Sequence, residues 1–365
     1  MRLSRITLTI ACIGWMHSAF AQETTPPAQV AAPEATPAST WPDPATSPAE
    51  MLDVARIQRS LMVDAAEARD RAVIVGDRGH ILVSESRSEW RQVPVPTRTL
   101  LTAVTAVDNR LWAVGHDQVI VYSSDGGLTW TLQYSDIASE GPLLDVLFLD
   151  AERGFAIGAY GQFLSTTDSG ATWTKEVISD RVAGADPLAA PIADVEEGED
   201  DSMLASTDVG EDEGDPHLNA ITRVSAGLLI VGEAGSVYRS IDNGATWERS
   251  DLPYDGSMFA LVPLDNGRVI AAGLRGNVFI TGDLGRTWQA MNSGTEASLF
   301  GGTAVPGGRA VLVGASGTVL LAPADTLDLR LFSFGDGGTM SAAIPISESE
   351  FVLVGENGVA NYSPN

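Results

Sequence analysis

The sequence is poor in thiols, in lysine and in long apolar runs. Among 365 residues there is one cysteine, Cys12, and one lysine, Lys175. Because Cys12 lies in an N-terminal segment that we expect to be removed, the mature chain is predicted to have neither a disulfide nor cysteine-based chemistry. No stretch reaches the roughly 18 consecutive apolar residues that a membrane-spanning helix needs. We therefore expect no direct membrane insertion.

Cations are scarce as a class. The chain has 22 Lys and Arg against 48 Asp and Glu, a formal net charge of -26. Phosphate backbones repel so acidic a chain, which argues against nucleic acid as a partner. Many of the acids lie between Arg181 and Arg223, where no lysine or arginine occurs. Such a stretch is typical of a solvated loop; the alternatives are a docking site for a basic partner or for Ca²⁺.

The N-terminus has the features of a secretory signal peptide. Two arginines precede an apolar run at residues 6–15, and residues 19–21 form a small-x-small cleavage site. We expect residues 1–21 to be the signal and the protein to be exported, to the periplasm or outside the cell. Residues 22–50 are rich in Pro, Ala and Thr and predict a flexible linker. Residues 51–365 are then the folded domain.

Four copies of the pattern Ser/Thr-x-Asp-x-Gly-x-Thr-Trp recur along the chain. In such a turn the carboxylate accepts hydrogen bonds from its own loop, the glycine takes the left-handed conformation and the tryptophan packs on the sheet. We assign a structural role to the residues at the third, fifth and eighth positions: Asp125, Gly127, Trp130, Asp168, Gly170, Trp173, Asp242, Gly244, Trp247, Asp283, Gly285 and Trp288. The pattern is eroded near Trp90 and near Leu329, where we expect looser outer edges.

An apolar run ending in glycine recurs as well. It occurs seven times, at Gly76, Gly115, Gly158, Gly232, Gly273, Gly314 and Gly355. A period of about 40 residues with several short apolar runs in each is typical of a β-propeller. We predict an all-β fold, a seven-bladed propeller of four-stranded antiparallel blades, with the acidic insertion at residues 179–217 between blades 3 and 4.

The seventh repeat stops before its outer strand. The chain ends at Asn365, at about the spacing from Gly355 where other repeats place their aspartate. Propellers commonly close by taking a strand from the other terminus. We predict that an N-terminal strand near Met51 to Ile57 pairs with blade 7 and closes the ring.

The turns between the second and third strands of each blade should share one face with the connections between blades. This face is the candidate partner-binding surface, formed by Asp77, Arg78, His80, His116, Tyr160, Glu233, Arg275, Asn277, Glu356 and Asn357. His80 and His116 are either solvated turn histidines or part of a metal or pH-sensitive site. No catalytic residue, cofactor or metal is predicted.

The aspartate pattern resembles the bacterial neuraminidase repeat, or Asp box, of sialidases and other glycoside hydrolases. A sialidase needs three arginines around the substrate carboxylate, a tyrosine nucleophile paired with glutamate, and an acid. The Arg-Ile-Pro signature of that family is absent, because Arg56 and Ile57 are followed by Gln58. A glycoside hydrolase or a carbohydrate-binding protein is therefore the alternative function.

Taken whole, the alternation of glycine turns with Asp boxes, as in residues 112–130 and 154–173, is similar to the photosystem II stability and assembly factor family. The similarity covers nearly all of residues 60–365 and implies a seven-bladed propeller without catalytic activity. It further implies an exported scaffold that helps to assemble or stabilise a membrane-associated protein complex or transporter. Related propellers in bacteria that do not photosynthesise often occur alongside membrane transporters. We expect a monomer.

Overall fold

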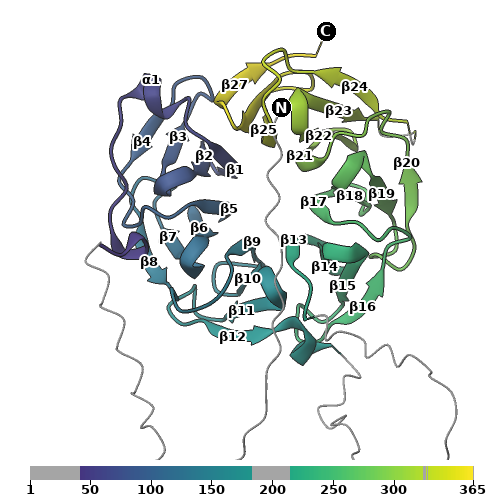
Figure 1. Ribbon diagram of the computed structural model, residues 1–365, viewed down its shortest axis with the longest axis horizontal. Helices are drawn as coiled ribbons and strands as arrows, with labels where there is room; N and C mark the ends of the chain where they lie inside the picture. The colour runs from purple at the N-terminus through teal and green to yellow at the C-terminus, as the bar shows by residue number, and fades with distance from the viewer. Residues whose placement is uncertain (1–41, 183–213, 324–325, 327, 365) are drawn as a thin grey trace, which may run out of the picture. The chain divides into compact units, whose positions relative to one another are not determined.

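The computed structural model describes residues 42–182, 214–323, 326 and 328–364, and the predicted signal peptide lies outside them. Seven antiparallel sheets follow one another around a ring, from blade 1 in purple to blade 7 in yellow (Figure 1). Six sheets have four strands and the last has three. The predicted seven-bladed propeller is confirmed. None of the helices in the described ranges is long and apolar enough to cross a membrane.

Within each blade the strands run in chain order from the ring centre outwards. Blades 1 to 3 contain β1 (Met62–Ala68), β2 (Arg71–Gly76), β3 (Ile81–Ser84) and β4 (Arg91–Val93); β5 (Leu101–Val107), β6 (Arg110–Gly115), β7 (Ile120–Ser123) and β8 (Thr131–Tyr134); and β9 (Leu143–Phe148), β10 (Gly154–Gly158), β11 (Gln162–Thr166) and β12 (Thr174–Val177). Blades 4 to 7 contain β13 (Leu218–Val224), β14 (Gly227–Gly232), β15 (Ser236–Ser240) and β16 (Glu248–Asp251); β17 (Met258–Pro263), β18 (Val269–Gly273), β19 (Val278–Thr281) and β20 (Gln289–Met291); β21 (Leu299–Val305), β22 (Arg309–Gly314), β23 (Thr318–Ala322) and β24 (Arg330–Ser333); and β25 (Met340–Pro345), β26 (Phe351–Gly355) and β27 (Gly358–Tyr362).

Each intact Asp box is a closed hydrogen-bonded turn between the third and fourth strands. In blade 2, Asp125 Oδ1 accepts the amides of Leu128 and Thr129, both at 3.0 Å, and Oδ2 accepts the Thr129 hydroxyl at 2.7 Å. The Trp130 indole donates to the Gly127 carbonyl at 2.9 Å, and Gly127 has φ 85°. In blade 4 the Thr246 amide is the main cause that holds the pKa of the equivalent Asp242 at about 2.

The box tryptophans join neighbouring blades. The motif alone predicted only that each tryptophan packs on the sheet of its own blade. Trp130 of blade 2 lies in one apolar cluster with Val73 and Val83 of blade 1. Trp247 of blade 4 meets the ring of Phe163 in blade 3 edge to face, with ring centroids 5.8 Å apart. A box therefore seals the joint between its own blade and the preceding one.

The eroded boxes keep this packing position. Trp90 of blade 1 is buried in a cluster that includes Ile344 and Val352 of blade 7. In blade 6, Leu329 stands in the tryptophan position and packs against the cluster shared by blades 5 and 6. The apolar residue of the motif thus persists at joints where the hydrogen-bonded aspartate is missing.

The predicted closing strand near Met51 to Ile57 is wrong. Residues Val54–Ile57 form a short helix, α1, whose first turn is capped because the Asp53 carboxylate accepts the Arg56 amide. Blade 7 keeps three strands. Its β27 donates one backbone hydrogen bond towards the N-terminal segment, from the Val359 amide to the carbonyl of Gln58 just after α1, at 3.1 Å. The local helix cap competes with extended pairing and replaces it here.

The ring closes instead by apolar packing between blades 7 and 1. Ile57 of α1 is buried in the cluster that holds Trp90 and Val354. At the ring centre the Ser341 hydroxyl of β25 donates to the Met62 carbonyl of β1 at 3.2 Å. The N-terminal segment therefore contributes the buried Ile57 side chain to this joint and no strand.

The last part of the predicted linker also differs from expectation. Residues 44–46 form the short 3₁₀ helix η1 (Pro44–Thr46), and Ala45 and Ala49 are buried against blade 1. The Ala49 amide donates to the Val95 carbonyl at 3.0 Å. The folded unit therefore begins at Pro42.

The packing between blades predicts that two box tryptophans differ in how much stability is lost when each is replaced with alanine. Trp247 is fully buried, whereas Trp173 is partly exposed. Replacing Trp247 with Ala should lower the free energy of unfolding by about 3–5 kcal/mol, because a cavity opens between blades 3 and 4. Trp173→Ala is the matched control and should cost clearly less. Urea denaturation followed by circular dichroism measures both, and equal losses would contradict the joint role.

Candidate functional site

The innermost strand of every blade contains a β-bulge near its start. The register between first and second strands shifts there, so one residue has no partner. The skipped residues are Val63, Thr102, Leu144, Asn219, Phe259, Phe300 and Ser341. All seven line one cavity of about 450 Å³, the central channel. Bulges re-aim side chains, and here they place a ring of residues around one end of the channel.

Polar residues of the channel join five pairs of blades, of which the bond from Ser341 of blade 7 to Met62 of blade 1 is described above. Asp64 of blade 1 accepts the Val104 amide of blade 2, and Asp145 of blade 3 accepts the Ile221 amide of blade 4, each at 2.8 Å. Thr102 donates to the Leu143 carbonyl at 2.7 Å, and Asn219 donates to the Met258 carbonyl at 2.9 Å. These bonds link blades 1 to 2, 3 to 4, 2 to 3 and 4 to 5, in that order.

The two other channel joints, between blades 5 and 6 and between blades 6 and 7, are apolar or rest on close backbone approach. Phe259 of blade 5 and Phe300 of blade 6 lie with ring centroids 5.4 Å apart. Between blades 6 and 7, a Cβ on Gly301 would lie 1.8 Å from the Ser341 carbonyl oxygen, so only glycine fits there. The channel mouth consequently has an aromatic side at blades 5 and 6 and a more polar side elsewhere.

The two channel carboxylates have raised pKa values. Burial raises the pKa of Asp64 to about 6, and burial together with the charge of Asp64 raises that of Asp145 to about 7. Among the described residues that line the channel there is no Arg, Lys or His to oppose them. The neutral, protonated forms of Asp64 and Asp145 are therefore favoured in the channel relative to the same groups in water.

The channel does not contain the groups of a sialidase. Its described lining has no arginine, tyrosine or glutamate. Asp64 and Asp145 each use one carboxylate oxygen to hold a backbone amide of the next blade, which is a structural task. The glycoside hydrolase alternative gains no support from this geometry.

The turns between second and third strands form the turn face, as predicted. In blades 1 to 6 they are the 3₁₀ turns η2 (Asp77–Gly79), η3 (His116–Gln118), η4 (Ala159–Gly161), η6 (Glu233–Gly235), η7 (Leu274–Gly276) and η8 (Ala315–Gly317). The middle residue of each has positive φ, from 50° to 56°. Turns η2, η3, η4, η7 and η8 contact the innermost strand of the next blade. The bulged strand starts, and hence the channel mouth, therefore lie on this face.

Six of the predicted partner-binding residues are exposed there: Arg78, His116, Tyr160, Arg275, Glu356 and Asn357. Asp77 and Glu233 are partly exposed. Asn277 is partly buried, and its amide donates to the Leu274 carbonyl of its own turn at 2.9 Å, which is a structural role.

His80 is not a surface residue, contrary to the prediction. It is 2% exposed, and neither ring nitrogen has a hydrogen-bond partner among the described residues. Desolvation lowers its pKa, so the neutral form is favoured. Position in the turn explains this, because the residue after each 3₁₀ turn stands at or just before the start of the third strand, where the equivalents Val119, Gln162, Ser236 and Thr318 are also buried. No group of three or more His, Cys, Asp or Glu in the described ranges is arranged to hold a metal ion.

Sequence reasoning missed the contact between His217 and Tyr160. The two rings meet edge to face with centroids 4.8 Å apart. The Gly161 amide donates to the Pro216 carbonyl at 3.0 Å, which holds this end of the acidic insertion on η4. Residues 183–213 of the insertion lie outside the described residues. The sequence did offer one signal, because His217 directly precedes Leu218, the first residue of the innermost strand of blade 4.

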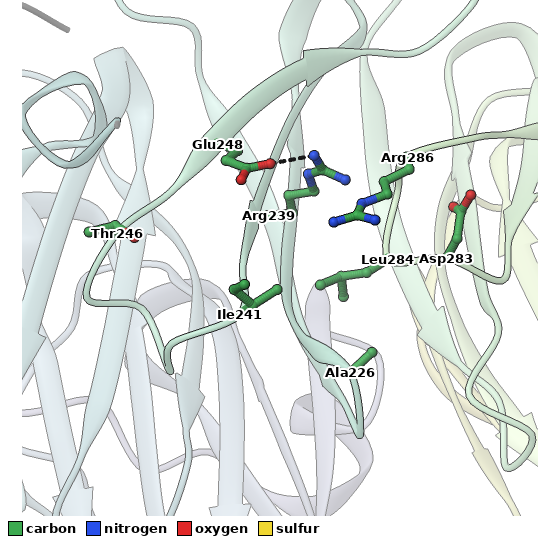
Figure 2. A pocket seen from close by; sticks show the side chains of 8 residues that line it. All are labelled: Ala226, Arg239, Ile241, Thr246, Glu248, Asp283, Leu284 and Arg286. Atoms are coloured by element: carbon green, nitrogen blue, oxygen red, sulfur yellow. Dashed lines mark hydrogen bonds and ion pairs between the residues drawn. The ribbon is translucent and has the colours of Figure 1, made fainter. Parts of the chain in front are cut away.

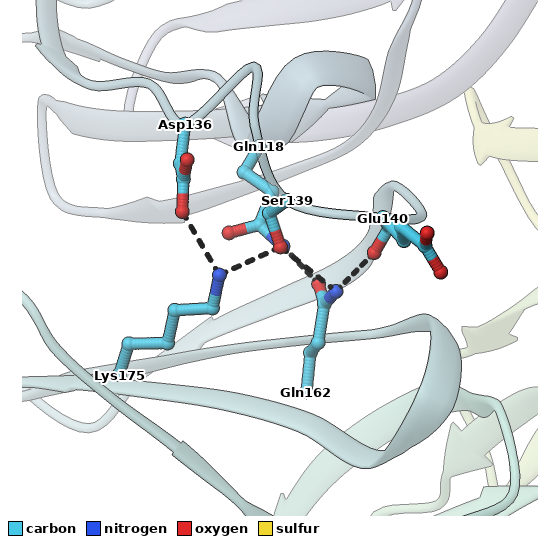
Figure 3. A network of polar contacts seen from close by, with 6 residues as sticks. All are labelled: Gln118, Asp136, Ser139, Glu140, Gln162 and Lys175. Carbon is cyan, nitrogen blue, oxygen red and sulfur yellow. Dashed lines mark hydrogen bonds and ion pairs between the residues drawn. The ribbon is translucent and has the colours of Figure 1, made fainter. Parts of the chain in front are cut away.

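A polar network supports the turn face at the joint of blades 2 and 3 (Figure 3). Gln118, which replaces the glycine found in other turns, is buried and donates to Gln162 and to the Ser139 hydroxyl. Lys175 donates to Asp136 at 2.9 Å and to Ser139 at 2.6 Å. The lysine hydrogen bond is the main cause that lowers the pKa of Asp136. The network explains why this blade departs from the glycine pattern, since the amide side chain connects two blades.

Comparison with known proteins identifies the family. The family model described as photosynthesis system II assembly factor YCF48 matches residues 82–199 and 133–328, more than half of the chain. This chain belongs to that family. A photosystem II assembly lipoprotein Ycf48 from Synechococcus sp. (strain CC9902) is 23% identical over 190 residues, covering 51% of this chain and 47% of the relative. One from Prochlorococcus marinus is 28% identical over 166 residues, covering 37% and 44%. The chain thus spans about half the length of the curated relatives it matches.

Solved structures share the fold of this YCF48-family chain. A structure described as YCF48 bound to D1 peptide has a TM-score of 0.60 at 13% identity, covering 84% of this chain and 93% of that one. A streptogramin B lyase has a TM-score of 0.66 at 10% identity, covering 85% and 95%. Because an assembly factor and a lyase are about equally similar, these likenesses concern the fold alone.

The raised pKa of Asp145 predicts a pH-dependent effect of removing its charge. A folded-state pKa of about 7 lies above the ordinary value of 3.8, so the stability linked to protonation is full below pH 3.8 and is lost as pH rises through 7. Asp145→Asn stays neutral and keeps an oxygen for the Ile221 amide. It should match the wild type near pH 4 and exceed its free energy of unfolding by on the order of 2 kcal/mol at pH 8.

Chemical denaturation at both pH values measures this difference. Asp265→Asn, which removes a charge from the exposed surface, is the control and should show little pH-dependent change. A pH-independent effect of Asp145→Asn would show that the pKa of the Asp145 carboxyl is not raised in the folded protein.

Proposed function

We propose that this chain is an exported, noncatalytic assembly or stability factor that binds a segment of a membrane-associated protein complex on its turn face. The observation that carries the proposal is Tyr160, a residue that is 55% exposed on η4 and has φ 55°. Membership of the YCF48 family supports the assembly role.

The conformation of Tyr160 favours recognition over packing. A bulky residue with positive φ is a costly outlier that persists only when its surroundings determine it. The six turns share this conformation, so the turn itself determines it. The His217 ring and the hydrogen bond from the Gly161 amide to the Pro216 carbonyl then support the tyrosine in its place. A fixed and exposed aromatic ring with a polar hydroxyl is the kind of side chain that anchors protein interfaces.

The channel mouth offers the second contact region on the same face. Phe300 is exposed at the mouth beside Phe259, and the carboxylates of Asp64 and Asp145 line the channel. An apolar side chain of a partner suits the phenylalanines, and a basic one suits the carboxylates. A formal net charge of -26 on the chain also attracts a partner segment that is basic.

The proposed client is therefore an extended, partly basic segment of a membrane protein. One solved family member is described as bound to D1 peptide, and the curated relatives are described as photosystem II assembly lipoproteins. We extend this class of client, a photosystem II or comparable membrane complex, to the present chain. Binding by side chains of turns requires no reacting group, which agrees with a noncatalytic scaffold.

Co-purification tests the proposal. Immobilised protein is incubated with detergent-solubilised membranes of the host, and bound proteins are identified by mass spectrometry. A membrane-complex subunit should be retained, and Tyr160→Ala should weaken its binding about tenfold because an interface anchor is lost. Leu331→Ala, which removes an exposed apolar side chain from the outer strand β24, is the control and should bind like the wild type.

Two results would contradict this function. One is the absence of any membrane-complex subunit from the wild-type eluate; the other is equal retention by Tyr160→Ala and the wild type. Turnover of a sialoside or polysaccharide would instead support the carbohydrate-active alternative.

A further inference from the structure

A pocket of about 270 Å³ lies between blades 4 and 5, away from the turn face (Figure 2). It is formed by the β13–β14 turn, the outer strands and the Asp-box turn of blade 4, and by the Asp-box turn of blade 5. Its lining residues are Ala226, Arg239, Ile241, Thr246, Glu248, Asp283, Leu284 and Arg286. Because Asp boxes join the third and fourth strands, this end of the blades is opposite to the turns between the second and third.

Two guanidinium groups share this pocket. The Arg239 side chain is 18% exposed, and one of its terminal nitrogens pairs with Glu248. Its Nε and Nη1 are buried and have no hydrogen-bond partner among the described residues. Buried donors without an acceptor are costly, and charged ones more so. The unused donors of Arg239 therefore call for an acceptor.

Arg286 supplies the second cation. It is exposed on the Asp-box turn of blade 5, and no acidic residue in the described part of the chain forms an ion pair with it. Figure 2 shows its guanidinium directed towards that of Arg239. Two like charges at close range repel, and the chain has few cations to place together. The repulsion is removed if an anion lies between them.

The acids in the pocket are already engaged. The Glu248 carboxylate pairs with Arg239. Asp283 accepts the hydroxyls of Thr281 and Thr287 and the amide of Thr287 within its own box. Neither acid bridges the two arginines, so the acceptor that the cations need has to come from outside the described residues.

We propose that this pocket binds a phosphate or sulfate group, alone or as the head group of a small molecule. Guanidinium groups bind such oxyanions through paired N–H donors, which two arginines provide from two sides. Ile241, which is 75% exposed, and Leu284 form an apolar wall beside the cations. That wall suits the carbon part of a phosphate ester. The site is separate from the proposed client surface, and neither proposal depends on the other.

Isothermal titration calorimetry with inorganic phosphate and with hexyl phosphate tests the site in the full chain. Saturable binding of phosphate is expected, and Arg286→Gln should weaken it about tenfold or more through the lost charge-assisted hydrogen bonds. Arg249→Gln is the matched control. It removes one positive charge at the residue that follows Glu248 on β16 and lies outside the pocket, so it should leave binding unchanged.

Two further measurements sharpen the test. Glu248→Gln should tighten phosphate binding, because the pocket loses its competing negative charge. If hexyl phosphate binds more tightly than inorganic phosphate, and Ile241→Ser removes the difference, the ligand is an ester; equal affinities indicate the free anion. No saturable binding, or equal losses in the Arg286 and Arg249 variants, would overturn the proposal.

Discussion

The fold depends on the joints between neighbouring blades. A four-stranded blade has two faces and cannot bury either of them alone, so each sheet needs the next one. Two sets of contacts hold every sheet in place, one near the ring centre and one near the rim. At the centre these are side-chain bonds such as Asp64 to Val104 and Thr102 to Leu143. At the rim a box residue such as Trp130 packs on the preceding blade. The Asp box is thus a means of connecting sheets as well as a turn.

The number of blades could be predicted because its signals are local. An Asp box such as residues 123–130 and a glycine such as Gly115 each describe one turn, and each turn recurs once per blade. The closure of the ring could not be predicted in the same way. Pairing of Met51 to Ile57 with blade 7 is a contact between distant parts of the chain, and it competes with the local cap at Asp53. Gln92 of blade 1 also keeps this segment away from blade 7. Its side-chain amide donates to the Glu50 carbonyl and accepts the Leu52 amide.

The candidate site was only partly predictable. Turn positions placed Tyr160, the middle residue of η4, and His116, the first residue of η3, correctly on the surface. His80 was misplaced because it stands after the three residues of its turn, where the equivalents Val119 and Ser236 are also buried. The bulge residues of the channel escaped notice because a register shift has no signature in a single strand. Arg239 and Arg286 escaped as well, since they lie on different blades and meet only in the folded ring.

The two-sided character of the channel mouth follows from how the joints are made. Blades 1 to 5 are joined by side chains that bond to backbone amides and carbonyls, so carboxylates, a hydroxyl and an amide line that part of the channel. Blades 5 and 6 are joined by two phenylalanines, and the contact of Gly301 with blade 7 excludes any side chain at that joint. Hydrogen-bonded joints alone, or apolar joints alone, could stabilise the whole ring. Because both kinds occur together, the channel has two carboxyl groups and other polar groups on one side and aromatic surface on the other.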